Sequence, residues 1–137
     1  MTVVVGPDFV LAVVRARHPR HRDAVALVET LDEDLVTSPL ALADIDREVA
    51  EATGAEAQQA VWRDFERGAY VVRWWADALK ETLAIARRHP GTGLTTASLV
   101  AVAGRVNTRR VATFDTQFRT LTTPDGEAFV VLPDDRP

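Results

Sequence analysis

The sequence predicts an α/β fold: a single domain over residues 1–137 with a central parallel sheet of about four to five strands and helices on both faces. Short apolar runs rich in valine alternate with longer stretches in which apolar residues recur every three or four positions. The first pattern is typical of buried strands and the second of amphipathic helices. Because a parallel crossover needs about a dozen residues, strands separated by helices indicate a parallel sheet.

The first strand and helix are predicted at the N-terminus. Val3 to Val5 form an apolar run that Gly6-Pro7 ends, and a compact apolar stretch follows from Phe9 to Val14. This order predicts strand, turn and helix. Pro19 separates that helix from a second one, whose apolar face comprises Ala24, Val25, Leu27, Val28 and Leu31.

The middle of the chain predicts one strand and two helices. Residues 35–37 are a short strand candidate, and Pro39 suits the first position of a third helix. The inward face of that helix holds Leu42, Ile45 and Val49, and Gly54 ends it. A fourth helix is predicted from about residue 56 to residue 67, where Gly68 ends it.

The last part of the chain repeats the alternation. Residues 70–74 are rich in β-formers and predict a third strand, followed by a helix from about residue 77 to residue 88. Thr95 or Thr96 can cap a further helix that runs to about residue 105. Residues 110–114 predict a strand with Asp115 at its end, and residues 129–132 predict a last short strand.

Composition limits the classes of function. The absence of cysteine excludes disulfides and thiolate chemistry. Acidic residues number 20 and basic residues 16, for a net charge of −4, so any contact with nucleic acid must be local. Neither serine stands in a G-x-S-x-G elbow, and no Walker sequence is present. Without a signal peptide or a membrane-length apolar run, we expect a cytoplasmic protein with no membrane association.

Three carboxylates are expected at the carboxyl edge of the sheet. Asp8 follows the first strand, Asp44 lies one turn into the helix after the second, and Asp115 ends the fourth. The Thr95-Thr96 turn is expected at the same edge. Open parallel sheets bind ligands there, at the point where the strand order reverses. Clustered carboxylates repel one another unless a cation lies between them, and Mg²⁺ takes a few oxygen ligands with retained waters.

Structural roles remain open for the same residues. Asp8 near a helix start can cap the helix and complement its dipole. Asp115 after a strand can be a turn residue. Asp44 is harder to explain in this way, because Glu48 one turn later places a like charge at an unfavourable spacing, although Arg47 can neutralise it.

A basic stretch and the tryptophans are candidates for nucleic-acid contact. Residues 15–22, RARHPRHR, hold four arginines and two histidines around a proline. Such a run can bind phosphates, which makes Arg15, Arg17 and Arg22 candidate RNA contacts, or it can be a solvated loop. Trp62, Trp74 and Trp75 can stack on bases, but we expect them to fill the core or a dimer interface.

Four stretches of the sequence together resemble the PIN domain, specifically the VapC toxins of bacterial VapBC toxin–antitoxin pairs. They are VVVGPDFVLAVV near the start, TSPLALADIDREVA at 37–50, GLTTASLVAVAGR at 93–105 and VATFDTQFR at 111–119. Their order and spacing match almost end to end. The resemblance implies a small parallel-sheet nuclease fold, a homodimer, a VapB-like antitoxin partner, and cleavage of RNA that depends on Mg²⁺ or Mn²⁺.

The resemblance also implies four acidic positions, of which this sequence keeps two. Asp44 matches a position that is usually Glu, and Asp115 matches the acid after the fourth strand. The other two positions align with Gly6 and Thr96, and a threonine hydroxyl can bind a metal or its water but brings no charge. Asp8 lies two residues beyond the first position, so its metal role requires a shifted turn, which Gly6-Pro7 can provide.

Two functions therefore follow from the sequence. The first is a metal-dependent endoribonuclease with Asp44, Asp115 and Asp8 as catalytic residues and metal ligands, and Thr96 as a neutral ligand. The alternative is a catalytically inactive PIN domain that acts as an RNA- or antitoxin-binding module. Sensitivity to EDTA and to carboxylate-to-amide changes distinguishes the two.

Overall fold

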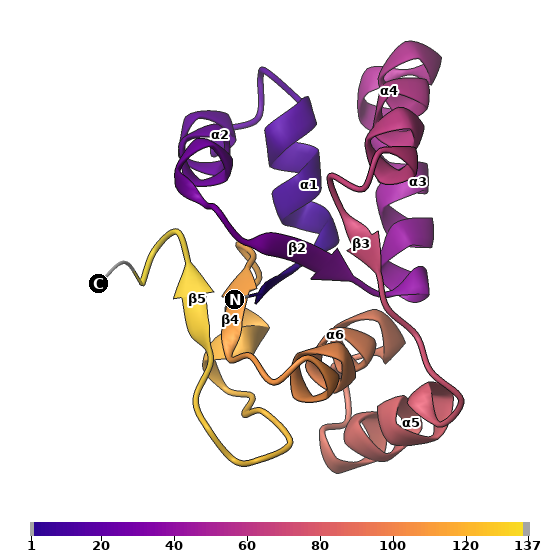
Figure 1. Ribbon diagram of the computed structural model, residues 1–137, viewed down its shortest axis with the longest axis vertical. Helices are drawn as coiled ribbons and strands as arrows, with labels where there is room; N and C mark the ends of the chain where they lie inside the picture. The colour runs from indigo at the N-terminus through magenta and orange to yellow at the C-terminus, as the bar shows by residue number, and fades with distance from the viewer. Residues whose placement is uncertain (1, 136–137) are drawn as a thin grey trace.

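The computed structural model describes residues 2–135 (Figure 1). Its elements follow one another as strands, α-helices and one short 3-10 helix, η1. In chain order they are β1 (Thr2–Val5), α1 (Pro7–Val14), α2 (His21–Thr30), β2 (Asp34–Thr37), α3 (Pro39–Thr53), α4 (Ala55–Glu66), β3 (Val71–Val72), α5 (Ala78–Arg88), α6 (Leu94–Arg105), β4 (Arg110–Ala112), η1 (Thr116–Arg119) and β5 (Val130–Leu132).

The five strands form one parallel sheet in the order β3-β2-β1-β4-β5. β1 is the central strand, and Val4 pairs with Val36 of β2 on one side and with Val111 of β4 on the other. The chain builds outward from β1 toward β3 and then returns to add β4 and β5 on the opposite side. The strand order thus reverses beside β1, where open parallel sheets place their binding sites.

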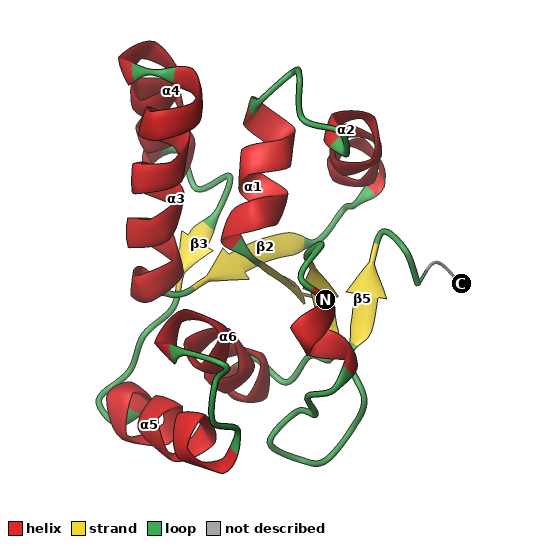
Figure 2. Ribbon diagram, turned by 180° about the vertical axis from the view of Figure 1, so that it is seen from behind, coloured by secondary structure: helices red, strands yellow, loops and turns green. Residues whose placement is uncertain are grey.

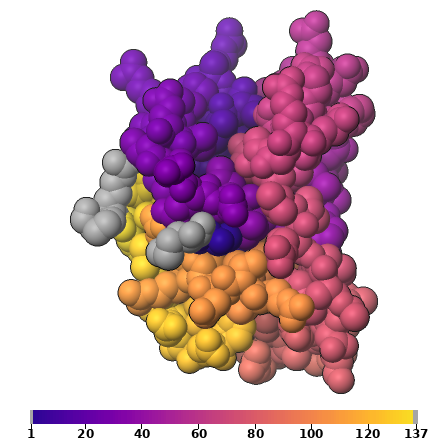
Figure 3. All heavy atoms as spheres, in the orientation of Figure 1, coloured from indigo at the N-terminus to yellow at the C-terminus, as the bar shows by residue number. Residues whose placement is uncertain are grey.

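Helices cover both faces of the sheet, as predicted (Figures 1 and 2). The side chains of β1 alternate between two cores, because successive residues of a strand point to opposite faces. Val3 and Val5 pack with residues of α1 to α4, whereas Val4 packs with residues of α5 and α6. The space-filling view shows the indigo-to-purple start of the chain packed directly above its orange and yellow end (Figure 3).

The third strand is shorter than the sequence predicts. It comprises only Val71 and Val72, and the backbone N–H of Arg73 adds one more bond, at 2.9 Å, to the carbonyl oxygen of Thr37. Tyr70 is buried before the strand, where its ring packs on Phe65 with centroids 5.3 Å apart. The strand predicted at 110–114 likewise ends at Ala112.

The tryptophans were predicted to fill the core or a dimer interface, and two of them lie outside the core. Trp62 on α4 is 47% exposed, and its indole N–H donates to Asp46. Trp74 is 37% exposed and leaves the sheet after β3. Trp75 alone packs against a core cluster, with Arg105 over its ring.

The predicted threonine cap of α6 is also wrong. The helix begins at Leu94 with Gly93 in the capping position, and no side chain caps it. Gly93 has a φ of 86°, in the region where side chains other than glycine are strained. Thr95 and Thr96 consequently lie inside the first turn, where their hydroxyls are available to neighbouring elements. In the described part of the chain, every helix is too short or too polar to cross a membrane.

Candidate metal-binding site at the carboxyl edge of the sheet

A cavity of about 360 Å³ lies at the carboxyl edge of the sheet. Segments far apart in sequence form it: the turn after β1, the middle of α3, the first turn of α6 and the segment after β4. Four carboxylates line it, those of Asp8, Asp44, Glu48 and Asp115. Gly6, Thr95, Thr96 and Thr113 complete its polar wall. The structure thus brings together the three predicted acids and Thr96, and adds a fourth acid.

Asp8 links the start of α1 to the end of β4. Its carboxylate accepts a 3.0 Å hydrogen bond from the hydroxyl of Thr113 and another, also 3.0 Å, from the backbone N–H of Phe114. Gly6 occupies the capping position of α1, which has no side-chain cap, so the interpretation of Asp8 as a helix cap is wrong. Burial raises the pKa of Asp8 although these hydrogen bonds lower it, and the charge of Asp115 raises the pKa further.

Gly6 leaves room for the Asp8 carboxylate. A Cβ atom at position 6 would lie 3.2 Å from Oδ1 of Asp8 and 3.3 Å from the hydroxyl oxygen of Thr113. The backbone of Gly6 is extended, with φ −93° and ψ 163°, a conformation open to any residue. Space, and not the unusual backbone angles considered from the sequence, therefore explains glycine at this position.

Asp44 is held from two sides. Its Oδ1 accepts a 2.9 Å hydrogen bond from Arg47, one turn along α3, and its Oδ2 accepts a 2.6 Å bond from the hydroxyl of Thr95. The predicted neutralisation by Arg47 is confirmed, and Asp44 in turn raises the pKa of that guanidinium. Thr95, which was expected at this edge of the sheet, thereby links α6 to α3. Thr96 lines the cavity beside it.

Asp115 combines a structural role with a place in the cavity. Its Oδ1 accepts a 2.9 Å hydrogen bond from the backbone N–H of Gln117 and so caps η1. The backbone N–H of Asp115 donates to the hydroxyl of Thr113, at 3.1 Å. Thr113 thereby contacts both Asp8 and Asp115 and fixes their relative position.

Glu48 is the functional candidate that sequence reasoning missed. It lies one turn after Asp44 on α3 and lines the same cavity. Its Oε2 atom is buried and has no hydrogen-bond partner among residues 2–135. Burial raises the pKa of Glu48, and the negative charges of Asp44 and Asp8 raise it further. The four-residue spacing from Asp44 was the available signal, because such residues share a helix face.

The donor set fits a hard divalent cation. Carboxylate and hydroxyl oxygens are the ligands that suit Mg²⁺ and Mn²⁺. Among residues 2–135, no three Asp, Glu or His side chains lie close enough to hold one ion between them. A Mg²⁺ ion in this cavity would therefore be held by one or two carboxylates directly and by the rest through retained waters. The buried, unpartnered oxygen of Glu48 and the unbalanced negative charge of the cavity favour a cation there.

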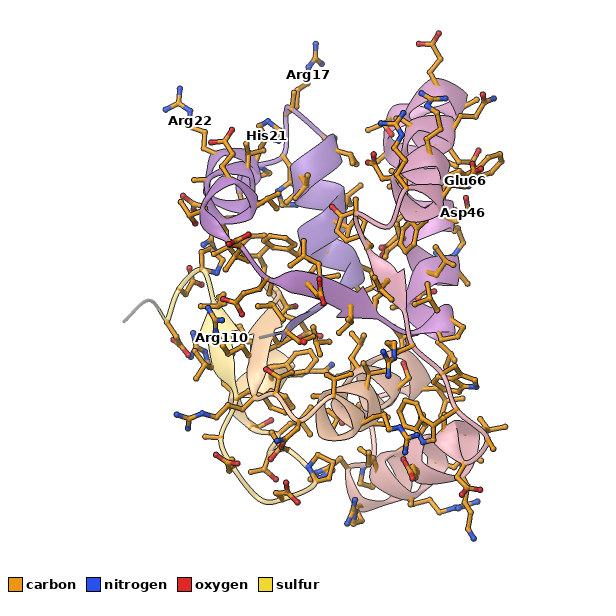
Figure 4. The ribbon with its side chains drawn as sticks, viewed as in Figure 1. Arg17, His21, Arg22, Asp46, Glu66 and Arg110 are labelled. Carbon is orange, nitrogen blue, oxygen red and sulfur yellow. The ribbon has the colours of Figure 1, made fainter. Side chains whose placement is uncertain are left out.

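The basic stretch lies at the other end of α1. Asp8 is in the first turn of this helix, whereas Arg15 follows its last residue. Arg17 and Arg22 project outward from the upper end of the domain (Figure 4). Within the stretch, His21 contacts the carbonyl oxygen of Ala12 at 2.8 Å through its Nδ1 atom. The structure does not bring the candidate RNA-binding arginines into the cavity.

A larger hollow, of about 1050 Å³, lies at the opposite edge of the sheet. Its wall carries charges of both signs, including Arg109, Arg110, Asp125 and Glu127. Arg110, labelled in Figure 4, forms an ion pair with Glu33. Asp135 also lines this hollow, and the two arginines offset part of its negative charge. The smaller cavity, by contrast, is lined by four carboxylates and by no arginine or lysine among the described residues.

Comparison with known proteins identifies the family. The sequence profile of the PIN domain matches residues 8–123. This chain belongs to the PIN domain family. The profile match begins at Asp8 and includes the helix that carries Asp44 and Glu48 and the segment that carries Asp115, so all four carboxylates of the cavity lie within the matched region.

Individual relatives extend over nearly the whole of this PIN domain. Ribonuclease VapC26 of Mycobacterium tuberculosis is 27% identical over 135 residues, which cover 96% of this chain and 100% of that protein. The crystal structure of VapC20 from the same species, described as a Sarcin-Ricin loop cleaving toxin, matches with a TM-score of 0.77 and 21% identity over 82% of this chain and 89% of that one. A toxin–antitoxin complex from Klebsiella pneumoniae matches with a TM-score of 0.66 and 12% identity, over 84% and 88% of the two chains.

Proposed function

We propose that this PIN-domain protein is a VapC-like endoribonuclease, dependent on Mg²⁺ or Mn²⁺, and the toxin of a toxin–antitoxin pair. One observation carries the proposal: Asp8, Asp44 and Asp115 reach the same cavity from three separate elements, at the strand-order reversal of a PIN domain. The relation to ribonuclease VapC26 over the full length supports RNA as the substrate. A cytoplasmic location follows from that substrate.

The carboxylates have distinct tasks in this proposal. One or two of the carboxylates of Asp8, Asp44 and Asp115 would bind the cation directly and the others through retained waters, with the Thr96 hydroxyl as a neutral ligand of the cation or its water. A divalent cation bound there supplies an activated water and offsets charge that develops on the phosphate. Thr113 and Thr95 would keep Asp8 and Asp44 in position through the hydrogen bonds described above.

Arg15, Arg17 and Arg22 are the proposed contacts for the RNA backbone. Asp8 lies in the first turn of α1 and Arg15 directly follows its last residue, so about 10 Å of helix, at 1.5 Å per residue, separates Asp8 from the start of the basic stretch. An RNA segment that runs along α1 would reach the phosphate-binding arginines on one side of the scissile bond. Each neutralised phosphate makes the affinity more dependent on salt.

A VapB-like antitoxin and a second copy of this chain are the proposed protein partners. The Klebsiella relative was solved as a toxin–antitoxin complex. The exposed rings of Trp62 and Trp74 support a protein interface, because aromatic residues are enriched in such surfaces. Sedimentation of the purified protein tests the homodimer, since a mass of about 30 kDa is expected from a 15.0 kDa chain.

The nuclease proposal is tested with a mixed RNA substrate in Mg²⁺ or Mn²⁺. We expect cleavage that is lost in EDTA and in Asp115→Asn. Asp125→Asn is the matched control, because the same change is made at an exposed residue outside the cavity. Equal inactivity of the wild type and Asp115→Asn at high protein concentration in Mn²⁺ would refute the nuclease proposal.

The inactive binding module has one observation in its favour. Both carboxylate oxygens of Asp44 already accept hydrogen bonds, from Arg47 and Thr95, which satisfies this residue without a cation. Under this alternative, affinity for RNA or for an antitoxin would be indifferent to EDTA. Asp44→Asn and Asp115→Asn would then leave that affinity nearly unchanged.

A further inference from the structure

Glu48 shares the cavity with the three predicted acids. It follows Asp44 by four residues on α3, so both side chains leave the helix on the same face. Two carboxylates at this spacing repel each other unless a positive charge offsets them. Arg47 lies between them in sequence, but its hydrogen bond is to Asp44.

The Oε2 atom of Glu48 differs from the other acids of this cavity in its hydrogen bonding. It is buried, yet no donor in the described part of the chain reaches it. The other acids are better satisfied: Asp8 accepts from Thr113 and Phe114, and Asp115 accepts from Gln117. An unpaired buried polar oxygen costs about 1–3 kcal/mol, so its persistence in the fold calls for a partner supplied from outside the chain.

The distribution of charge among the cavity residues also favours a role for Glu48 in cation binding. Gly6 and Thr96 line the cavity without contributing charge. Glu48 places a carboxylate on the α3 side of the same space, opposite the end of β4 that carries Asp115.

We propose that Glu48 is a cation ligand of this cavity, binding Mg²⁺ or Mn²⁺ through Oε2, directly or through one retained water. The inference shares with the proposed function the need for a cation in this cavity, but it does not require that RNA be cleaved. It also gives α3 two ligands, Asp44 and Glu48, so that this helix contributes as much charge as Asp8 and Asp115 together.

Metal affinity is the direct test, measured as Mn²⁺ binding by titration calorimetry and by the electron paramagnetic resonance signal of free Mn²⁺. We expect Glu48→Gln to weaken binding by at least roughly tenfold, a loss typical even of residues that only support a ligand. Glu51→Gln is the matched control, because it removes the same charge from the same helix at an exposed residue outside the cavity, and it should stay near the wild-type affinity.

A second variant tests whether the loss of Mn²⁺ affinity comes from the lost carboxylate or from a change in the structure. Thr96→Asp added to Glu48→Gln returns one carboxylate to the cavity from α6, and it should recover much of the lost Mn²⁺ affinity. Thermal unfolding in EDTA should show that Glu48→Gln is folded and at least as stable as the wild type, because the substitution removes an unpaired buried charge.

The possible outcomes separate this inference from the nuclease proposal. Wild-type affinity in Glu48→Gln overturns the inference and leaves the nuclease proposal intact. Binding that depends on Glu48 without any RNA cleavage supports the inference and counts against the nuclease. A wild-type protein that binds no Mn²⁺ at millimolar concentration overturns both.

Discussion

Gly6 and Asp8 form a steric pair, because the carboxylate of Asp8 lies in the space that a side chain at position 6 would need. A Cβ atom there would come within 3.2 Å of Oδ1 of Asp8. Glycine at position 6 and the placement of the Asp8 carboxylate are therefore one structural arrangement. The carboxylate still projects into the cavity at the end of β1, although it arises from the first turn of α1.

The steric pair predicts a coupled response to substitution. Gly6→Ala should destabilise the protein by about 1–3 kcal/mol, the usual cost of overpacking a well-filled site. In an Asp8→Ala background, most of that cost should disappear, because the crowded oxygen is gone. Urea unfolding of the two single variants and the double variant measures this coupling. Additive effects would show that Gly6 and Asp8 do not compete for the same space.

The hydroxyl of Thr113 is expected to stabilise both flanking acids. It is buried, donates to Asp8 and accepts from the backbone N–H of Asp115. Thr113→Val keeps the shape but leaves these groups unpaired, which should cost about 1–3 kcal/mol in the free energy of unfolding. Urea unfolding measures it, with the exposed Thr122→Val as control. RNA cleavage should fall as well; an active and fully stable Thr113→Val would contradict the positioning role.

Thr96→Asp is expected to strengthen metal binding at the expense of stability without metal. The substitution adds a fifth carboxylate to the cavity, so like-charge repulsion should lower the melting temperature in EDTA. Each tenfold gain in Mn²⁺ affinity should return about 1.4 kcal/mol of stability at saturating metal. The readout is the difference in melting temperature between EDTA and Mn²⁺. Thr122→Asp, which adds the same charge outside the cavity, should show no larger metal response than the wild type.

The single tyrosine provides a prediction about pH. Burial raises the pKa of Tyr70 to about 12, and the nearby charge of Asp64 acts in the same direction. Because the folded pKa lies above the unfolded value near 10, the stabilisation from the neutral phenol is complete below pH 10 and is lost as the pH rises toward 12. Phenolate absorbance near 295 nm should stay low through pH 10. A midpoint near 10 with the fold intact would show that the ring is solvated.

The sequence allowed the fold to be predicted because the valine runs and the helical periodicity agree with each other at every step. The parallel strands, the helices on both faces and the end of α3 at Gly54 are all confirmed. The errors lie where tertiary contacts override local preference. The strand predicted at 70–74 is reduced to Val71 and Val72, with one further backbone bond from Arg73, and Gly93 rather than a threonine occupies the capping position of α6.

The location of the candidate site could be predicted from the sequence, but the predicted set of residues lacked Glu48. Asp8, Asp44 and Asp115 follow strands, and parallel topology gathers strand ends at one edge, so their common cavity could be expected. The role of Glu48 depends on which donors fail to reach it, and the role of Gly6 depends on an oxygen 3.2 Å away. Neither the missing donor at Glu48 nor the close contact at Gly6 is encoded in a local pattern of residue types.

The bond between Asp8 and Thr113 spans 105 residues of sequence. During synthesis at about 5–20 residues per second, the ribosome needs about 5–20 s to add the residues that separate them. Until Thr113 has been added, Asp8 lacks this hydrogen-bond partner and the cavity cannot form. The cavity, and any activity that depends on it, can therefore form only after almost the whole chain has been translated.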